Sequence, residues 1–157
     1  LRERNKGVPM FAYGVSFGAN LVIKLAGEMG GKFPLDGLIT ISTPFDCRLC
    51  GEYFDKRKLL NKWLVNEMKK TLLEPHIDML KPLEESHGID IDKAMAAKLA
   101  YEFDHHITTK MYGFKSVEDY RYDNSCGHWL HEIKKPAFLL HALDDPICVK
   151  ECIPWDK

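Results

Sequence analysis

The feature that most constrains this chain is a Gly-x-Ser-x-Gly pattern at residues 14–18, placed between two segments of different periodicity. The apolar run at about residues 8–14 is typical of a buried parallel strand. Residues 16–29 then carry apolar side chains at helical spacing. Because a second apolar run follows at about residues 37–42, the segment predicts a strand–helix–strand unit with two parallel strands.

This setting predicts a nucleophile elbow at Ser16, in which a sharp turn strains the backbone and projects the hydroxyl above the sheet. We expect Gly14 and Gly18 to be small because both positions approach neighbouring backbone. The backbone N–H of Phe17 opens the helix and faces the place where an oxyanion would form. The ordinary alternative is a strand–turn–helix junction in which Ser16 only caps the helix.

A serine nucleophile needs a base, and the base needs an acid that orients it. A third apolar run at about residues 136–142 is followed by Asp144, Asp145 and Pro146. The acid of such a site follows a later strand, and the register of the flanking prolines favours Asp145 over Asp144. The alternative is that the two aspartates only form a turn.

The expected base is missing from this chain, because no histidine follows Asp145. His141 falls within the predicted third strand, and the other six lie in the helical region or its flank. We therefore expect the catalytic histidine and the second oxyanion donor outside this chain, and the chain alone to be inactive. The seven histidines are His76, His87, His105, His106, His128, His131 and His141.

Residues 47–134, approximately, have helical periodicity and separate the second strand from the third. The prediction is a single incomplete α/β domain over residues 1–157, with parallel core strands and a helical lid insertion. The first residue is Leu1 rather than Met, and residues 1–6 have the pattern of a helix end. The sequence therefore predicts an internal piece of a longer protein.

Charge and hydropathy exclude several classes of protein. Lys and Arg total 22 and Asp and Glu total 23, so the net charge of −1 removes the main driving force for nucleic-acid binding. No apolar run approaches the ~20 residues that cross a bilayer. Five cysteines without a secretory signal favour reduced thiols. A cytosolic-facing or membrane-associated protein is therefore expected rather than a secreted one.

Two patterns that could suggest a metal are weak. Cys47 and Cys50 form a C-x-x-C, but no second ligand pair follows at a zinc spacing. Adjacent side chains such as His105 and His106 point ~100° apart on a helix, so they rarely share one ion. We expect no metal site.

Four ordered motifs between residues 14 and 146 add a more specific signal. They are GVSFGAN at 14–20, ISTPFD at 41–46, a spaced set in the helical region, and ALDDP at 142–146. The spaced set comprises Phe103, Asp104, Thr108, Gly113, Phe114, Tyr120 and Ser125. Together they resemble the YheT-like, ABHD-type esterase and lipase branch of the α/β-hydrolase superfamily.

The resemblance implies a partial α/β-hydrolase fold in which Ser16 is the nucleophile, Asp145 the acid and Phe17 an oxyanion donor. It implies no metal or organic cofactor. The implied substrates are acyl lipids or short-to-medium-chain esters, processed through an acyl-serine, with hydrolysis and acyl transfer both open. Membrane association through segments absent here also stays open. The alternative is a non-catalytic fragment or degenerate hydrolase that binds a lipid or a partner.

Overall fold

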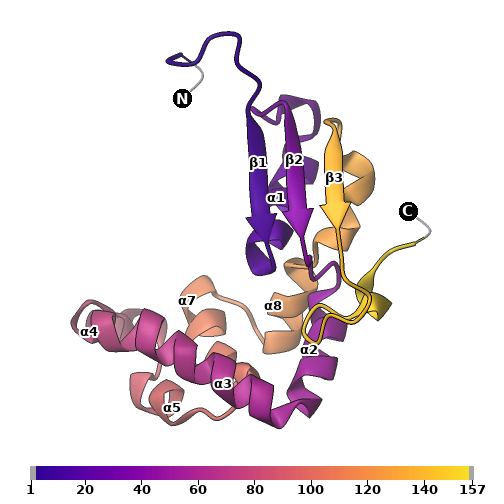
Figure 1. Cartoon of the computed structure of the whole chain (residues 1–157). Helices are drawn as coiled ribbons and strands as arrows, with labels where there is room; N and C mark the ends of the chain where they lie inside the picture. Colours follow the sequence, from indigo (N-terminus) through magenta and orange to yellow (C-terminus); the bar gives the residue numbers. More distant parts are fainter. Residues whose placement is uncertain (1–2, 156–157) are drawn as a thin grey trace. The chain divides into compact units, whose positions relative to one another are not determined.

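The computed structural model describes residues 3–155, and the chain divides into two compact units (Figure 1). The first unit holds the chain up to Cys50 and from Asn124 onwards, and the second is Gly51–Asp123. Of the predicted helix end, Leu1 and Arg2 lie outside the described residues. Residues 3–7 form turns and a bend, so that prediction is wrong for the described part.

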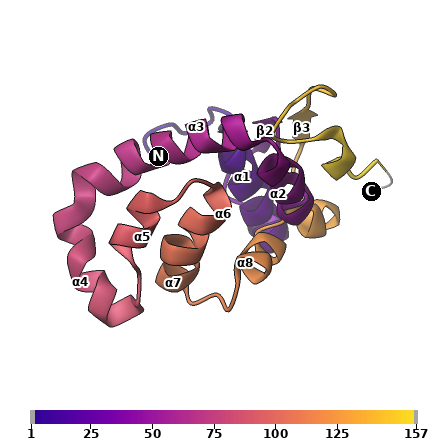
Figure 2. The same cartoon turned by 90° about the horizontal axis from the view of Figure 1, so that it is seen from below.

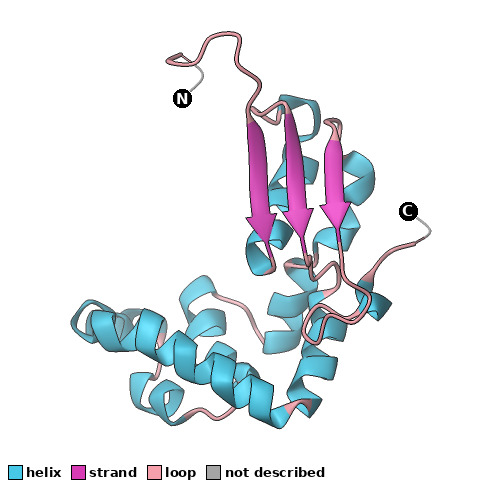
Figure 3. Ribbon diagram, in the orientation of Figure 1, coloured by secondary structure: helices cyan, strands magenta, loops and turns pink. Residues whose placement is uncertain are grey.

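The first unit is built on a parallel sheet with the order β1-β2-β3 (Figure 3). The strands are β1 Phe11–Val15, β2 Gly37–Ile41 and β3 Ala137–Leu140. Strand β1 begins later than predicted, because Pro9 has no N–H and the Met10 N–H donates to the Asp36 carboxylate. The predicted α/β fold with parallel core strands is confirmed.

One face of this sheet is covered by helix α1 (Phe17–Met29) and the 3₁₀ segment η5 (Cys126–Glu132), which pack on each other (Figure 1). Short 3₁₀ segments η1 (Gly30–Lys32) and η6 (Lys150–Cys152) complete the unit. The buried side of α1 includes Ala19, Ile23 and Ala26. The helix predicted from the apolar spacing of residues 16–29 is confirmed.

The prediction of fully buried strands is wrong for β1 and β3. Phe11 and Tyr13 on β1 are exposed, and so is every residue of β3. The physical reason is that β1 and β3 are the two edges of the sheet and only one face carries packed helices. A run of apolar residues shows that the side chains favour burial, but their actual burial depends on which elements pack against them.

Between β2 and β3 the chain is helical, and most of these helices lie in the second unit, Gly51–Asp123. Figure 2 shows α3 and α4 forming an outer arc, with α5, α6 and α7 inside it. None of the described helices is long and apolar enough to cross a membrane. The elements from α2 onwards are α2 Cys47–Lys56, α3 Lys58–Met68, η2 Lys69–Leu73, η3 Glu74–His76, α4 Ile77–His87, α5 Ile91–Ala96, α6 Ala100–Phe103, η4 Asp104–Thr108, α7 Thr109–Tyr112 and α8 Val117–Asp123.

A polar network ties the helices of the second unit together. The buried Asn61 side chain accepts from the Ala100 N–H at 2.6 Å and donates to the Asp55 carboxylate at 3.1 Å. Arg121 pairs with the same carboxylate at 3.0 Å. Nearby, burial raises the pKa of the Asp104 carboxyl to about 6, although Thr108 donates a hydrogen bond to it. These contacts give α2, α3, α6 and α8 fixed positions within this unit.

Candidate active site

The turn between β1 and α1 has the strained geometry predicted for a nucleophile elbow. Ser16 is the N-cap of α1 with φ 54° and ψ −126°, a conformation that residues other than glycine rarely adopt. Its backbone N–H donates to the Ile41 carbonyl at 2.9 Å, which fixes the turn to the end of β2. Ser16 is exposed to solvent. The prediction of a positive φ at Ser16 is confirmed.

The two glycines of the motif have different reasons to be present. A Cβ added to Gly14 would lie 2.6 Å from the Gly18 carbonyl oxygen and 2.7 Å from the Ala19 Cα. These are backbone atoms that cannot move aside, so Gly14 must lack a side chain. A Cβ at Gly18 would meet no heavy atom within 4 Å among the described residues. The expectation that Gly18 must be small is therefore wrong, because that position of α1 faces open space.

This difference gives a matched pair of variants. Gly14→Ala is expected to lower the free energy of unfolding by about 1–3 kcal/mol, since the added methyl overlaps backbone. Gly18→Ala should change it by a few tenths of a kcal/mol or raise it, because alanine favours the helix. Thermal unfolding followed by circular dichroism measures both. Equal midpoints for the two variants would contradict the close packing of the elbow.

Phe17 is the first residue of α1. Backbone N–H groups in the first turn of a helix have no intrahelical acceptor and carry the positive end of the helix dipole. The N–H of Phe17 follows Ser16 directly, so it is the donor nearest in sequence to an oxyanion formed at that side chain. The geometry is that of a helix N-terminus that can stabilise an anion, beside the candidate nucleophile Ser16.

Asp145 lies in the loop after β3, where its carboxylate is held by backbone donors. Its Oδ1 accepts from the Ile147 N–H at 2.8 Å and from the Cys148 N–H at 2.9 Å. Burial alone would raise the pKa of Asp145, but these two bonds, the Ser42 side chain and nearby His141 hold the pKa below its usual value. Asp145 is therefore ionised at neutral pH. The neighbouring candidate, Asp144, is exposed to solvent.

Ser42 also lies at the carboxyl ends of the strands, directly after β2, and it was not predicted from the sequence. It follows β2 with φ 52° and donates its N–H to the Leu140 carbonyl at 2.9 Å. Its side chain hydrogen-bonds with Asp145. The ISTPFD motif marked residues 41–46 as a conspicuous segment, but it did not indicate that Ser42 contacts Asp145.

Cys148 links the loop that carries Asp145 to Ser16. Its thiol is buried and in hydrogen-bond contact with the Ser16 side chain, while its N–H donates to Asp145. Burial, with the nearby Asp145 carboxylate, raises the pKa of the Cys148 thiol to about 12. The carbonyl of Cys148 accepts from His141 Nε2 at 2.6 Å. Ser16 and Asp145 therefore share a common neighbour at the carboxyl ends of the strands.

The cysteines of the C-x-x-C do not face each other. The Cys47 thiol contacts the carbonyls of Pro44 and Asn124, whereas Cys50 is in hydrogen-bond contact with Cys152. Within residues 3–155, no three His, Cys, Asp or Glu side chains are grouped so that they could hold a metal ion.

Comparisons with known proteins identify relatives of this chain. The chain is 32% identical over 146 residues to "Phospholipase ABHD3" of Bos taurus, covering 93% of this chain and 35% of that protein. It is 27% identical to "Putative esterase YheT" of Escherichia coli K12, covering 93% and 42%, and 27% identical to "Monoacylglycerol lipase" of Saccharomyces cerevisiae, covering 94% and 33%. The chain thus spans about a third of the length of the relatives that it matches first.

No solved structure matches the chain. The model of the Hydrolase_4 family, described as serine aminopeptidase, S33, matches residues 1–152. Both this match and the named relatives cover the elbow, the helical insertion and the loop that carries Asp145. The chain therefore belongs to the Hydrolase_4 (serine aminopeptidase, S33) family of α/β-hydrolases, in the branch that contains YheT-like and ABHD-type proteins.

Proposed function

We propose that the complete protein is a serine hydrolase that cleaves carboxylic esters, with Ser16 as nucleophile and Asp145 as the acid of its triad. The observation that carries this proposal is the strained backbone of Ser16, φ 54°, at an exposed strand-to-helix turn. A serine held in this way is costly, and such strain concentrates at functional sites. Asp145 lies in the loop after β3 and is ionised, so it can serve as the acid that the reaction also requires.

The reaction begins when Ser16 Oγ attacks the ester carbonyl and its proton passes to a histidine contributed from outside this chain. The C–O bond to the alcohol then breaks, and that histidine protonates the leaving alkoxide. The Phe17 N–H donates to the oxyanion of the tetrahedral intermediate. Asp145 holds the histidine in the tautomer that accepts the serine proton and stabilises its charged form. Water or another alcohol then takes the acyl group from Ser16.

The substrate class follows from the relatives' names, which include a phospholipase, an esterase and a monoacylglycerol lipase. All three names describe proteins that act on esters, and two of them on lipids. We assign acyl lipids or short-to-medium-chain esters to this protein as the substrate class. Hydrolysis and acyl transfer share the acyl-serine and differ only in the acceptor.

A fluorophosphonate probe tests the proposal, because it phosphonylates only an activated serine. In the complete protein we expect the label on Ser16, located by peptide mass spectrometry, and its loss in Ser16→Ala. Ser86→Ala is the matched control, since Ser86 lies on the exposed side of α4. A label on Ser42, which also has a positive φ, would reassign the nucleophile. A folded protein without any label would support the non-catalytic alternative, a lipid- or partner-binding module.

A further inference from the structure

Helix α3 presents two large apolar side chains to solvent on one face. Leu59 is 88% exposed and Trp63 is 58% exposed. Residues four apart lie on the same side of a helix, so these two side chains are neighbours. Exposed apolar groups that gather on one face indicate a contact surface, whereas scattered ones need no explanation.

The opposite face of α3 is fixed in the core of the second unit. Val65 is fully buried, and the buried Asn61 side chain bonds to Ala100 and Asp55. The helix therefore cannot rotate to bury Leu59 and Trp63 without breaking these contacts. Their exposure is set by the packing of the helix within its own unit.

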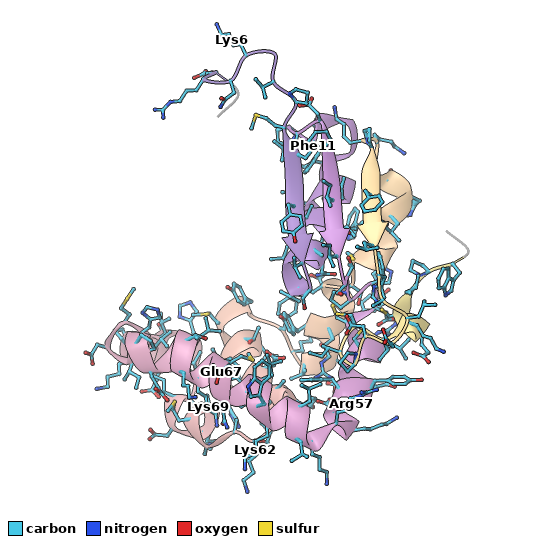
Figure 4. The ribbon with its side chains drawn as sticks, viewed as in Figure 1. Lys6, Phe11, Arg57, Lys62, Glu67 and Lys69 are labelled. Carbon is cyan, nitrogen blue, oxygen red and sulfur yellow. The ribbon has the colours of Figure 1, made fainter. Side chains whose placement is uncertain are left out.

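Basic side chains surround this apolar pair. Arg57, Lys58 and Lys62 are exposed, and Figure 4 shows Lys62 extending away from α3 and Arg57 near its start. Within residues 3–155, none of the three has a carboxylate partner at ion-pair distance. The acidic residue on this side of the helix, Glu67, is paired with Lys70 at 3.2 Å. Exposed basic side chains therefore adjoin the apolar pair at the start of α3.

We propose that this face of α3, formed by Leu59, Trp63, Lys58 and Lys62 and preceded by Arg57, docks on the surface of a bilayer that contains anionic lipids. Trp rings are favoured at the membrane interface, and a neighbouring leucine adds apolar area that can enter the acyl boundary. Each Lys or Arg near an anionic surface adds electrostatic attraction. A helix with apolar residues on one face and basic residues beside them is the pattern of an interfacial contact.

A protein partner fits this surface less well. A stable protein interface buries about 800 Å² on each partner around a packed centre. Here two apolar side chains project from a single helix, and the rest of the patch is flexible and basic. Two protruding side chains suit a deformable lipid surface better than a preformed groove. This inference does not depend on the proposed hydrolase activity.

The first test is quenching of Trp fluorescence by brominated lipids in the complete protein. We expect vesicles of brominated phosphatidylcholine with phosphatidylserine to quench Trp63, and the quenched fraction to fall in Trp63→Phe. All other tryptophans, which include Trp129 and Trp155, contribute equally to both samples. Because the readout follows one ring, it works even if another segment anchors the protein. Equal quenching of the wild type and Trp63→Phe would overturn the proposal.

The second test concerns charge. In vesicle co-sedimentation with phosphatidylserine, the Lys58→Gln and Lys62→Gln double variant should bind about twenty-fold more weakly, or show a matching loss of Trp63 quenching. The matched control is Lys110→Gln with Lys115→Gln, two exposed lysines elsewhere in the same unit. An equal loss of vesicle binding in the control variant would show a general effect of charge. Unchanged quenching of wild-type Trp63 on vesicles of pure phosphatidylcholine would show docking that does not need anionic lipid. Either result contradicts the proposal.

Discussion

Asp145→Asn is expected to lower the kcat of the complete protein for a p-nitrophenyl ester by about 10⁴. The asparagine keeps an oxygen that can accept from the Ile147 and Cys148 N–H groups, so the loop should retain its shape. It loses the negative charge that holds the histidine in the productive tautomer and stabilises its protonated form. The main effect should therefore appear in turnover, with a smaller loss of stability because the missing charge also contributes to folding.

Asp144→Asn is the matched control, because Asp144 precedes Asp145 in the same loop and its side chain is exposed. We expect its kcat to stay within about twofold of the wild type, since a single exposed charge acts weakly through solvent. Thermal midpoints of both variants verify that the fold is intact. Equal losses of turnover, or a larger loss for Asp144→Asn, would assign the acid to the other aspartate or to neither.

The lowered pKa of Asp145 also predicts how its contribution to stability changes with pH. Its folded pKa lies below the value of an unfolded aspartate. Its contribution to stability is therefore complete above the ordinary aspartate pKa and is lost as the pH falls through the lower, folded value. Over the neutral range the carboxylate stays charged, as an orienting group for a histidine must.

The elbow could be predicted from the sequence because its causes are local. The strand, the turn and the helix are consecutive, and the close approach to Gly14 comes from Gly18 and Ala19. The same local pattern was misleading for Gly18, because whether a helix position faces other atoms depends on what packs there. Within the described residues, nothing lies over that position.

The rest of the site depends on contacts between distant parts of the chain. The link from Cys148 to Ser16 and the bond from Ser42 to Asp145 connect residues far apart in sequence. Neither cysteine nor serine is a specific signal by itself, so no spacing rule points to them. The burial of β3 was overestimated for a related reason. Its apolar run showed what the side chains prefer, and the sheet exposes them at its edge.

The 157-residue chain by itself is expected to react with a fluorophosphonate far more slowly than the complete protein. A neutral serine hydroxyl is a poor nucleophile without a base within about 2.6–3.2 Å. In a serine protease, loss of the histidine alone costs about 10⁶ in turnover, nearly as much as loss of the whole triad. A missing oxyanion donor adds a further factor of about 10²–10³, although such losses do not multiply cleanly.

The one histidine that the described residues place near the acid is His141. Its Nε2 lies 2.6 Å from the Cys148 carbonyl oxygen, which can only accept, so Nε2 carries the proton. Its Nδ1 is buried and has no hydrogen-bond partner within residues 3–155. A ring held in this way orders the loop that carries Asp145, and within residues 3–155 it makes no hydrogen bond to Ser16. We therefore interpret His141 as a structural residue.

Labelling the chain and the complete protein at equal concentration tests both statements. Strong labelling of Ser16 is expected only in the complete protein, and His141→Asn in that protein should reduce labelling only as far as it lowers the thermal midpoint. Circular dichroism of the isolated chain shows whether it is folded before its label is compared. Rapid labelling of Ser16 in the isolated chain, abolished by His141→Asn while helix content is unchanged, would identify His141 as the base. That outcome would require one nitrogen of the ring to come within hydrogen-bond reach of Ser16 Oγ.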